Sequence, residues 1–137
     1  MKLIKEKKKI SFVICIVILL VIIIFMLFKN FGENLTLEQR LERISKEFYS
    51  EHYYKEVSKT YNEKDKTTYL KQLESIGVKL SLDDLRRYRY SNIDINKELE
   101  YFNTATCDLL NTIVIIYPED PYGETNYKID IKLDCEQ

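Results

Sequence analysis

The sequence holds one short segment in which arginines are interleaved with tyrosines, Arg86-Arg87-Tyr88-Arg89-Tyr90. A guanidinium group binds phosphate or carboxylate through a planar fork of N–H donors, and a tyrosine ring can stack on bases or sugars. These five residues could therefore bind a phosphate-rich polymer. They could equally form a solvated surface that pairs with the many nearby acids. We take them as a possible surface binding patch, called the Arg86–Tyr90 patch below.

Two cysteines, Cys107 and Cys135, bracket two apolar segments, 109–117 and 127–133. The intervening residues include two prolines and a glycine, which is a turn composition, so the segments are predicted to form a β-hairpin. A hairpin centred on Pro121 sets apolar residues opposite one another and also sets the two cysteines opposite one another. The opposed pairs are then Leu109–Leu133, Asn111–Ile131, Ile113–Ile129 and Ile115–Tyr127.

We expect Cys107 and Cys135 to form a structural disulfide. A redox site is not indicated, because the sequence has no C-x-x-C motif and no histidine near either cysteine. Closing a chain loop of this length contributes about 3–4 kcal/mol to stability by the chain-entropy argument.

Residues typical of catalysis are sparse. His52 is the single histidine, and Glu51 and Glu56 lie near it. Residues 52 and 56 share a helix face, so a two-ligand surface metal site is conceivable, but two ligands rarely hold a metal. The sequence has no G-x-S-x-G motif, no phosphate-binding loop and no nucleophile with a base at motif spacing. We therefore expect no catalytic activity, no bound metal and no cofactor.

The most apolar segment of the chain is 10–28, which carries no charge over 19 residues. As a helix it would rise roughly 28 Å, close to the thickness of a bilayer core. Five lysines lie within residues 1–9, and the positive-inside rule then places this basic tail in the cytoplasm. The segment is longer than a cleaved signal sequence. The sequence thus predicts a single-pass membrane protein with a signal anchor, a connector over 29–35 and an extracellular domain over 36–137.

The segment from residue 30 to the C-terminus holds 15 Lys and Arg against 21 Asp and Glu, a net charge of −6. Nucleic-acid affinity comes mainly from neutralising phosphates, so this acidic segment argues against a nucleic-acid partner. Leu, Ile, Val and Phe are frequent enough to indicate a folded domain rather than a disordered one. The expected partners are the membrane and a protein of the cell envelope.

Local signals predict the order of elements. Thr36 and Gln39 form a capping box before a helix that runs to about Ser58. A second helix over 66–75, capped by Asp65, ends at Gly77. A short strand over 78–80 follows, then a helical turn capped by Ser81 and ending near Arg87, and another helical turn over 97–102. The fold class is α+β, with two or three helices packed on an antiparallel, hairpin-based sheet. The helices should cover the second apolar face of the first hairpin strand, at Leu110, Val114 and Ile116.

Two segments carry a family resemblance: TTYLKQLESIGVKLSLDDLRRY and TCDLLNTIVIIYPEDPYGETNYKIDIKLDC. They resemble a group of uncharacterised exported proteins of low-GC bacteria, with a shared cysteine pair and an IYPEDPYG-type turn. The resemblance implies fold and location, and it carries no known activity. The layout of an apolar N-terminal helix before an α+β head is also similar to type IV pilins, although the pilin processing site is absent.

Three functions are compatible with these features. The first is a non-catalytic domain that binds a protein partner or helps an assembly in the cell envelope. The second is a pilin-like structural subunit. The third is an envelope domain that binds or hydrolyses a polymer, which would need a concave cluster of tyrosines, arginines and carboxylates.

Overall fold

The computed structural model describes Ile14, residues 16–26 and residues 34–136. The chain divides into two compact units, Met1–Leu35 and Thr36–Gln137. In the first unit, Ile14 and residues 16–26 are helical. The predicted basic tail over 1–9 and most of the predicted connector over 29–35 lie outside the described residues.

The prediction of a transmembrane helix over residues 10–28 is contradicted. Among the residues that the structure describes, no helix combines the length and the apolar character needed to cross a membrane. The same finding contradicts the predicted single-pass membrane localisation, which included a signal anchor and an extracellular domain. Residues 10–13, 15, 27 and 28 of the predicted span lie outside the described residues.

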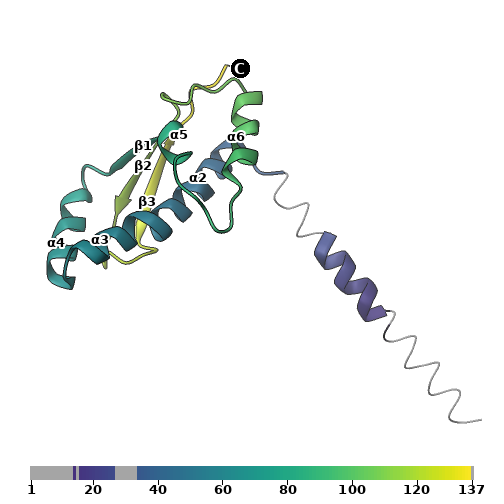
Figure 1. Ribbon diagram of the computed structural model, residues 1–137, viewed down its shortest axis with the longest axis horizontal. Coiled ribbons are helices and arrows are strands. Elements are labelled where there is room, and N and C mark those ends of the chain that lie inside the picture. Colours follow the sequence, from purple (N-terminus) through teal and green to yellow (C-terminus); the bar gives the residue numbers. More distant parts are fainter. Residues whose placement is uncertain (1–13, 15, 27–33, 137) are drawn as a thin grey trace, which may run out of the picture. The chain divides into compact units, whose positions relative to one another are not determined.

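The second unit is α+β and contains a three-stranded antiparallel sheet in the order β1-β2-β3. Helices lie against one face of this sheet, and α4 lies at one end (Figure 1). The strands are β1 (Val78–Ser81), β2 (Ile113–Pro118) and β3 (Tyr127–Lys132). The helices are α2 (Leu37–Phe48), the π-helix η1 (Tyr49–Tyr53), α3 (Tyr54–Thr60), α4 (Glu63–Leu73), α5 (Leu82–Leu85) and α6 (Ile95–Thr104).

Side-chain caps begin the helices. Thr36 and Gln39 form the predicted capping box of α2, and Ser81 with Asp84 forms one at α5. The prediction that Asp65 caps α4 was wrong. The N-cap is Asn62, whose side chain accepts a hydrogen bond from the Asp65 amide at 3.0 Å, so α4 begins three residues before the predicted start at residue 66. Asn and Asp are nearly equivalent caps, so residue type alone did not separate these two positions.

The long first helix is interrupted by the π-helix η1, which the sequence did not predict. The amide of Tyr54 donates to the carbonyl of Tyr49, five residues earlier. In an uninterrupted α-helix, His52 would follow Phe48 on the buried stripe, because residues four apart share a face. The wider turn shifts this phase, so that the apolar Val57 of α3 is buried and His52 is only partly buried.

The predicted hairpin register is wrong by three residues. Ile113 lies opposite Lys132 and Ile116 opposite Ile129, whereas Cys107 still lies opposite Cys135. The difference arises at Asp108, whose Oδ1 accepts hydrogen bonds from the amides of Leu110 and Asn111 at 2.8 and 3.0 Å. Residues 108–112 therefore form a turn rather than the start of the strand. The predicted pairs Leu109–Leu133, Asn111–Ile131, Ile113–Ile129 and Ile115–Tyr127 are absent from the β2–β3 ladder.

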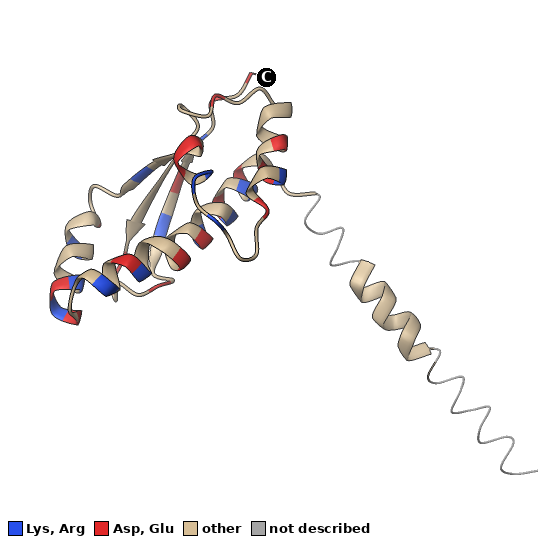
Figure 2. Ribbon diagram, in the orientation of Figure 1, with Lys and Arg blue, Asp and Glu red and all other residues tan. Residues whose placement is uncertain are grey.

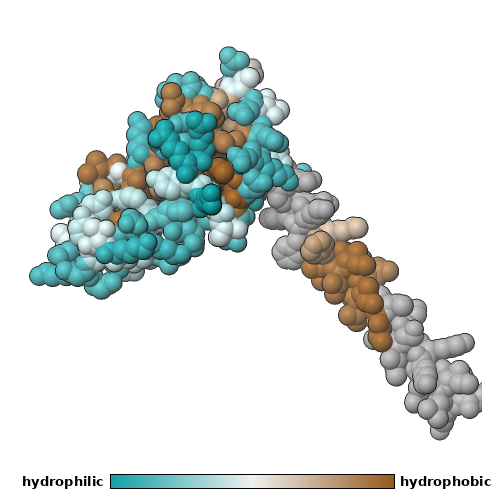
Figure 3. Space-filling model, viewed as in Figure 1, coloured by the Kyte–Doolittle hydropathy of each residue, from teal (hydrophilic) through white to brown (hydrophobic). Residues whose placement is uncertain are grey.

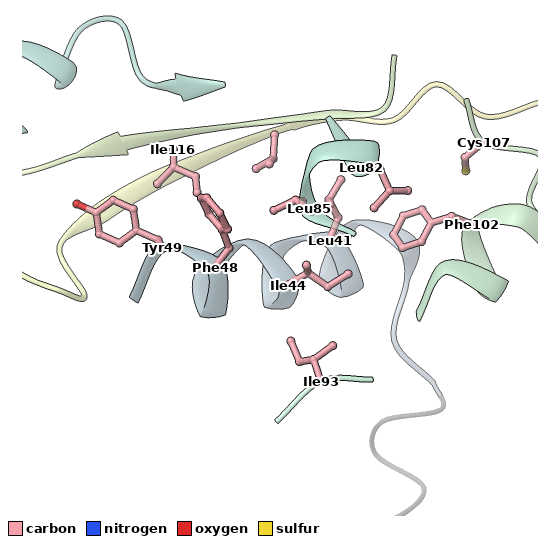
Figure 4. Close-up of a cluster of buried hydrophobic side chains, with 11 residues drawn as sticks. Leu41, Ile44, Phe48, Tyr49, Leu82, Leu85, Ile93, Phe102, Cys107 and Ile116 are labelled. Carbon is pink, nitrogen blue, oxygen red and sulfur yellow. The ribbon is translucent and has the colours of Figure 1, made fainter. Parts of the chain in front are cut away.

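The core lies between the sheet and the helices, as Figure 4 shows. Val114 and Ile116 are fully buried there, so the predicted helical cover of this strand face is confirmed for these two residues, whereas Leu110 is 68% exposed. The other buried members are Leu41, Ile44, Phe48, Tyr49, Leu82, Leu85, Ile93, Phe102 and Cys107.

A buried ion cluster fastens α6 to α2. Glu98 of α6 binds Arg40 at 3.0 Å and also binds Arg43, and only Arg43 is substantially exposed. The Arg40 guanidinium lies 3.4 Å from the centroid of the Tyr101 ring, which adds a cation–π contact. A charge removed from water is tolerated only where it is paired, so this cluster fixes the position of α6.

Candidate functional site

The residues of the Arg86–Tyr90 patch have different surroundings in the structure. Arg86 and Arg87 both form ion pairs of 2.7 Å with Asp83, one with each carboxylate oxygen. Asp83 lies in the first turn of α5 and is almost fully buried. Two of the three guanidinium groups are therefore occupied within the domain, which agrees with the interpretation of a surface that pairs with nearby acids.

The two tyrosines of the patch differ in role. The Tyr90 hydroxyl donates to the Leu85 carbonyl at 2.8 Å, and burial raises the pKa of this phenol. Tyr88 is 39% exposed and packs edge-on against Phe48, with 4.7 Å between ring centroids. Tyr90 is thus a structural residue, whereas part of the Tyr88 ring remains exposed.

His52 joins the patch through Arg89. Its Nε2 lies 2.7 Å from the Arg89 carbonyl oxygen, and because a carbonyl can only accept, Nε2 is the donor. The His52 ring also lies 5.1 Å from the Tyr88 ring and 5.7 Å from the Tyr90 ring. The Arg89 side chain is exposed. His52 therefore holds the Tyr88–Arg89 segment against η1.

These contacts create a shallow cavity of about 290 Å³ beside η1 and α3. We call it the aromatic groove. It is lined by Phe48, Glu51, His52, Tyr53, Lys55, Glu56, Lys59 and Tyr88. Its rings come from Phe48, His52, Tyr53 and Tyr88, and the other four residues supply charges. Acidic and basic residues alternate along α2 and α3 in Figure 2, and this side of the unit is mostly hydrophilic in Figure 3.

The charged residues of the groove neutralise one another. Lys55 binds Glu51 at 2.7 Å, and Lys59 binds Glu56 at 3.4 Å. The hydrogen bond that Lys55 donates to Glu51 raises the pKa of Lys55. Both carboxylates that flank His52 are thus held by lysines rather than turned toward the histidine. In the part of the chain that the structure describes, no three His, Cys, Asp or Glu side chains converge as a metal site would require.

Sequence reasoning missed His52 as a member of the site. The ring of Phe48 lies 6.1 Å from that of His52, four residues along the helix, and this spacing was visible in the sequence. The contact of His52 with residues 88–90 was not visible, because it joins segments that are 36 or more positions apart.

The two cysteines lie outside the aromatic groove. The Sγ atoms of Cys107 and Cys135 are 2.08 Å apart and bonded, with a sequence separation of 28. Asp108, Asp134 and Glu136 lie around this bond. The disulfide ties the segment before β2 to the segment after β3.

Comparisons of the chain with protein families, with curated proteins and with solved structures found no match. The resemblance to exported proteins of low-GC bacteria therefore stays a prediction.

Proposed function

We propose that residues 36–137 form a non-catalytic protein-interaction domain that binds its partner at the aromatic groove. The observation that supports this most is the arrangement of Tyr88, which is part-exposed over buried Phe48 and flanked by His52 and Arg89. Energetic hot spots of protein interfaces are enriched in tyrosine and arginine, and they lie in well-packed apolar centres with polar rims.

The polar groups of the groove are paired within the domain. Glu51 and Glu56 form ion pairs with lysines, and the Nε2 of His52 donates a hydrogen bond to a main-chain carbonyl. These contacts make the groove a fixed shape with balanced charge.

The ion pairs of Asp83 with Arg86 and Arg87 argue against the alternative function of binding a phosphate-rich polymer. Binding to a phosphate-rich polymer rises with the number of cations that are free to replace counterions. Arg86 and Arg87 already pair with Asp83, which leaves Arg89 as the one arginine of the patch for which no ion pair is found among the described residues.

Affinity capture with the full-length protein tests the proposal. We expect Tyr88→Ala and Arg89→Glu each to reduce the amount of captured partner at least tenfold, by quantitative mass spectrometry. Tyr61→Ala is a matched control, because Tyr61 is also 39% exposed and its ring also packs on a neighbour, Tyr69. Lys97→Glu is the control for charge. Equal loss of the partner from the control variants, with all variants folded by thermal unfolding, would contradict the proposal.

A further inference from the structure

We propose a second binding surface, which consists of the outer edge of β3 and the adjoining face of α2. It accepts an extended segment of another protein as a fourth strand of the sheet, with basic side chains turned toward α2. This surface shares no residue with the aromatic groove, so the inference goes beyond the proposed function and does not depend on it.

The edge of β3 presents unsatisfied backbone groups. In an antiparallel ladder, residues that bond to the neighbouring strand alternate with residues whose N–H and C=O point away from it. The amide of Glu119 donates to the carbonyl of Asn126 at 2.9 Å, which fixes the alternation. Residues 128, 130 and 132 thus bond to β2, and Tyr127, Ile129 and Ile131 point outward. Within the described residues no strand lies beyond β3.

The opposite edge of the sheet is less available. β1 has only four residues, and by the same alternation its outward-pointing residues are Lys79 and Ser81. The Ser81 amide already donates to Asp84 Oδ2 at 2.9 Å as part of the α5 cap. A partner strand would therefore find a longer row of free groups on β3 than on β1, and strand addition takes its affinity from such main-chain hydrogen bonds.

A cavity of about 640 Å³ lies along the β3 edge and against α2. It is lined by Glu38, Gln39, Glu42, Ile129, Asp130 and Ile131, with three carboxylates and no cation. Glu42 pairs with Lys46 one turn along α2, and Asp130 pairs with Lys128 at 3.6 Å, whereas no ion pair of Glu38 is found in the described part of the chain. Alternate side chains of an added strand would point into this cavity, where lysine or arginine would meet Glu38 and Glu42 on α2.

The charge distribution disfavours a second copy of this chain as the occupant. Two copies joined through β3 in a continuous antiparallel sheet would bring their α2 helices onto the same face. Glu38 and Glu42 of one copy would then approach the same carboxylates of the other, and like charges at an interface repel one another. A partner with basic side chains toward α2 avoids this repulsion.

Binding of a designed peptide to the full-length protein tests the inference. The probe is a blocked peptide with three lysines alternating with valines. We expect saturable binding, with slower hydrogen exchange at the amides of Ile129 and Ile131. The double variant Glu38→Lys/Glu42→Lys should weaken binding at least tenfold. The control Glu100→Lys/Glu136→Lys, with the same net charge, should bind like the wild type, and thermal unfolding would confirm that both variants fold.

Three outcomes would overturn the inference. The first is an absence of binding. The second is equal binding of a peptide that is N-methylated at alternate amides, because such a peptide keeps its charge but cannot pair as a strand. The third is protection of Ile129 and Ile131 that rises with protein concentration in the absence of peptide, since this would identify a second copy as the occupant.

Discussion

The buried side chain of Glu98 forms ion pairs with two arginines, Arg40 and Arg43. Arg40 is 2% exposed, so it has almost no access to water if Glu98 is lost. The contribution of such a cluster is better measured by removing one member than by adding up its contacts, since desolvation offsets much of the attraction.

We expect Glu98→Gln to lower the free energy of unfolding by about 3 kcal/mol, because it removes the buried carboxylate that pairs with both Arg40 and Arg43. Urea unfolding monitored by circular dichroism measures the change. Glu100→Gln is the matched control, since Glu100 is an exposed glutamate of the same helix, and it should change stability by less than about 0.5 kcal/mol. A similar loss in both variants would contradict this role of Glu98.

Several tyrosines resist ionisation. A hydrogen bond to Glu74, at 2.6 Å, together with burial raises the pKa of Tyr122 to about 12. Burial is the main cause of the raised pKa of Tyr49 and Tyr53, and a hydrogen bond between Tyr53 and Tyr69 at 3.0 Å adds to the rise at Tyr53. These phenols hold their protons more tightly in the folded state than in the unfolded chain.

Stability should therefore fall at alkaline pH. For a group whose folded pKa is raised, the stabilisation is complete below the unfolded pKa, about 10 for tyrosine, and is lost as the pH rises through the folded value. For Tyr122 this window runs from about pH 10 to about 12. We expect the urea midpoint to fall across this window while these tyrosines ionise only on unfolding. Full tyrosine ionisation, seen by ultraviolet absorbance, with an unchanged circular dichroism spectrum would contradict this.

At the scale of elements, Gly77 sets the junction between α4 and β1. Its φ of +73° favours glycine, and a Cβ at this position would lie 2.4 Å from Ile115 Cγ2. α4 ends at Leu73, and the turn that follows it can pass close to β2 at Gly77 only because the side chain is absent.

We expect Gly77→Ala to destabilise the domain by about 2–4 kcal/mol, from backbone strain and from the overlap with Ile115. Gly123→Ala is the control. Its φ lies outside the left-handed region, and its added Cβ would meet the side chain of Asn126, which can rotate away. Differential scanning calorimetry should show a much larger fall in Tm for Gly77→Ala. Equal shifts for both variants would refute this assignment.

Local elements were predictable where one side chain decides the structure. The caps at Thr36 and Ser81 and the positive φ of Gly77 follow from residue type and short spacing, although α4 ends at Leu73 rather than at the predicted residue 75. The hairpin register failed because residues 108–112 fit two local structures. Leu109 and Leu110 suit a strand, but Asp108 binds the following amides and forms a turn. Residue type alone did not decide between these two structures.

At the scale of the whole molecule, the disulfide joins the two ends of the C-terminal hairpin. Its two cysteines are 28 residues apart, and removing this closed loop should lower the free energy of unfolding by about 3–4 kcal/mol. Chemical unfolding of the wild type with and without a reductant, and of Cys107→Ser/Cys135→Ser, measures the loss. The reduced wild type and the double variant should agree. Alkylation of both thiols in protein isolated without reductant would contradict the bond.

The candidate site was only partly predictable from the sequence. Tyr88 of the predicted Arg86–Tyr90 patch lines the aromatic groove, but residue types could not show that Asp83 pairs with two of its arginines or that His52 contacts it. Such contacts depend on how α2, η1 and α5 pack, and that packing follows from the shared core rather than from any one segment.

Site-specific photo-crosslinking tests the central claim, that the aromatic groove is the surface that binds a partner protein, most directly. A benzophenone amino acid replaces Lys55, which lines the groove, or Lys97, which is exposed on α6. We predict a discrete protein adduct from residue 55 that Tyr88→Ala abolishes, and none from residue 97. The absence of an adduct at residue 55, or the same adduct from both positions, would contradict the claim.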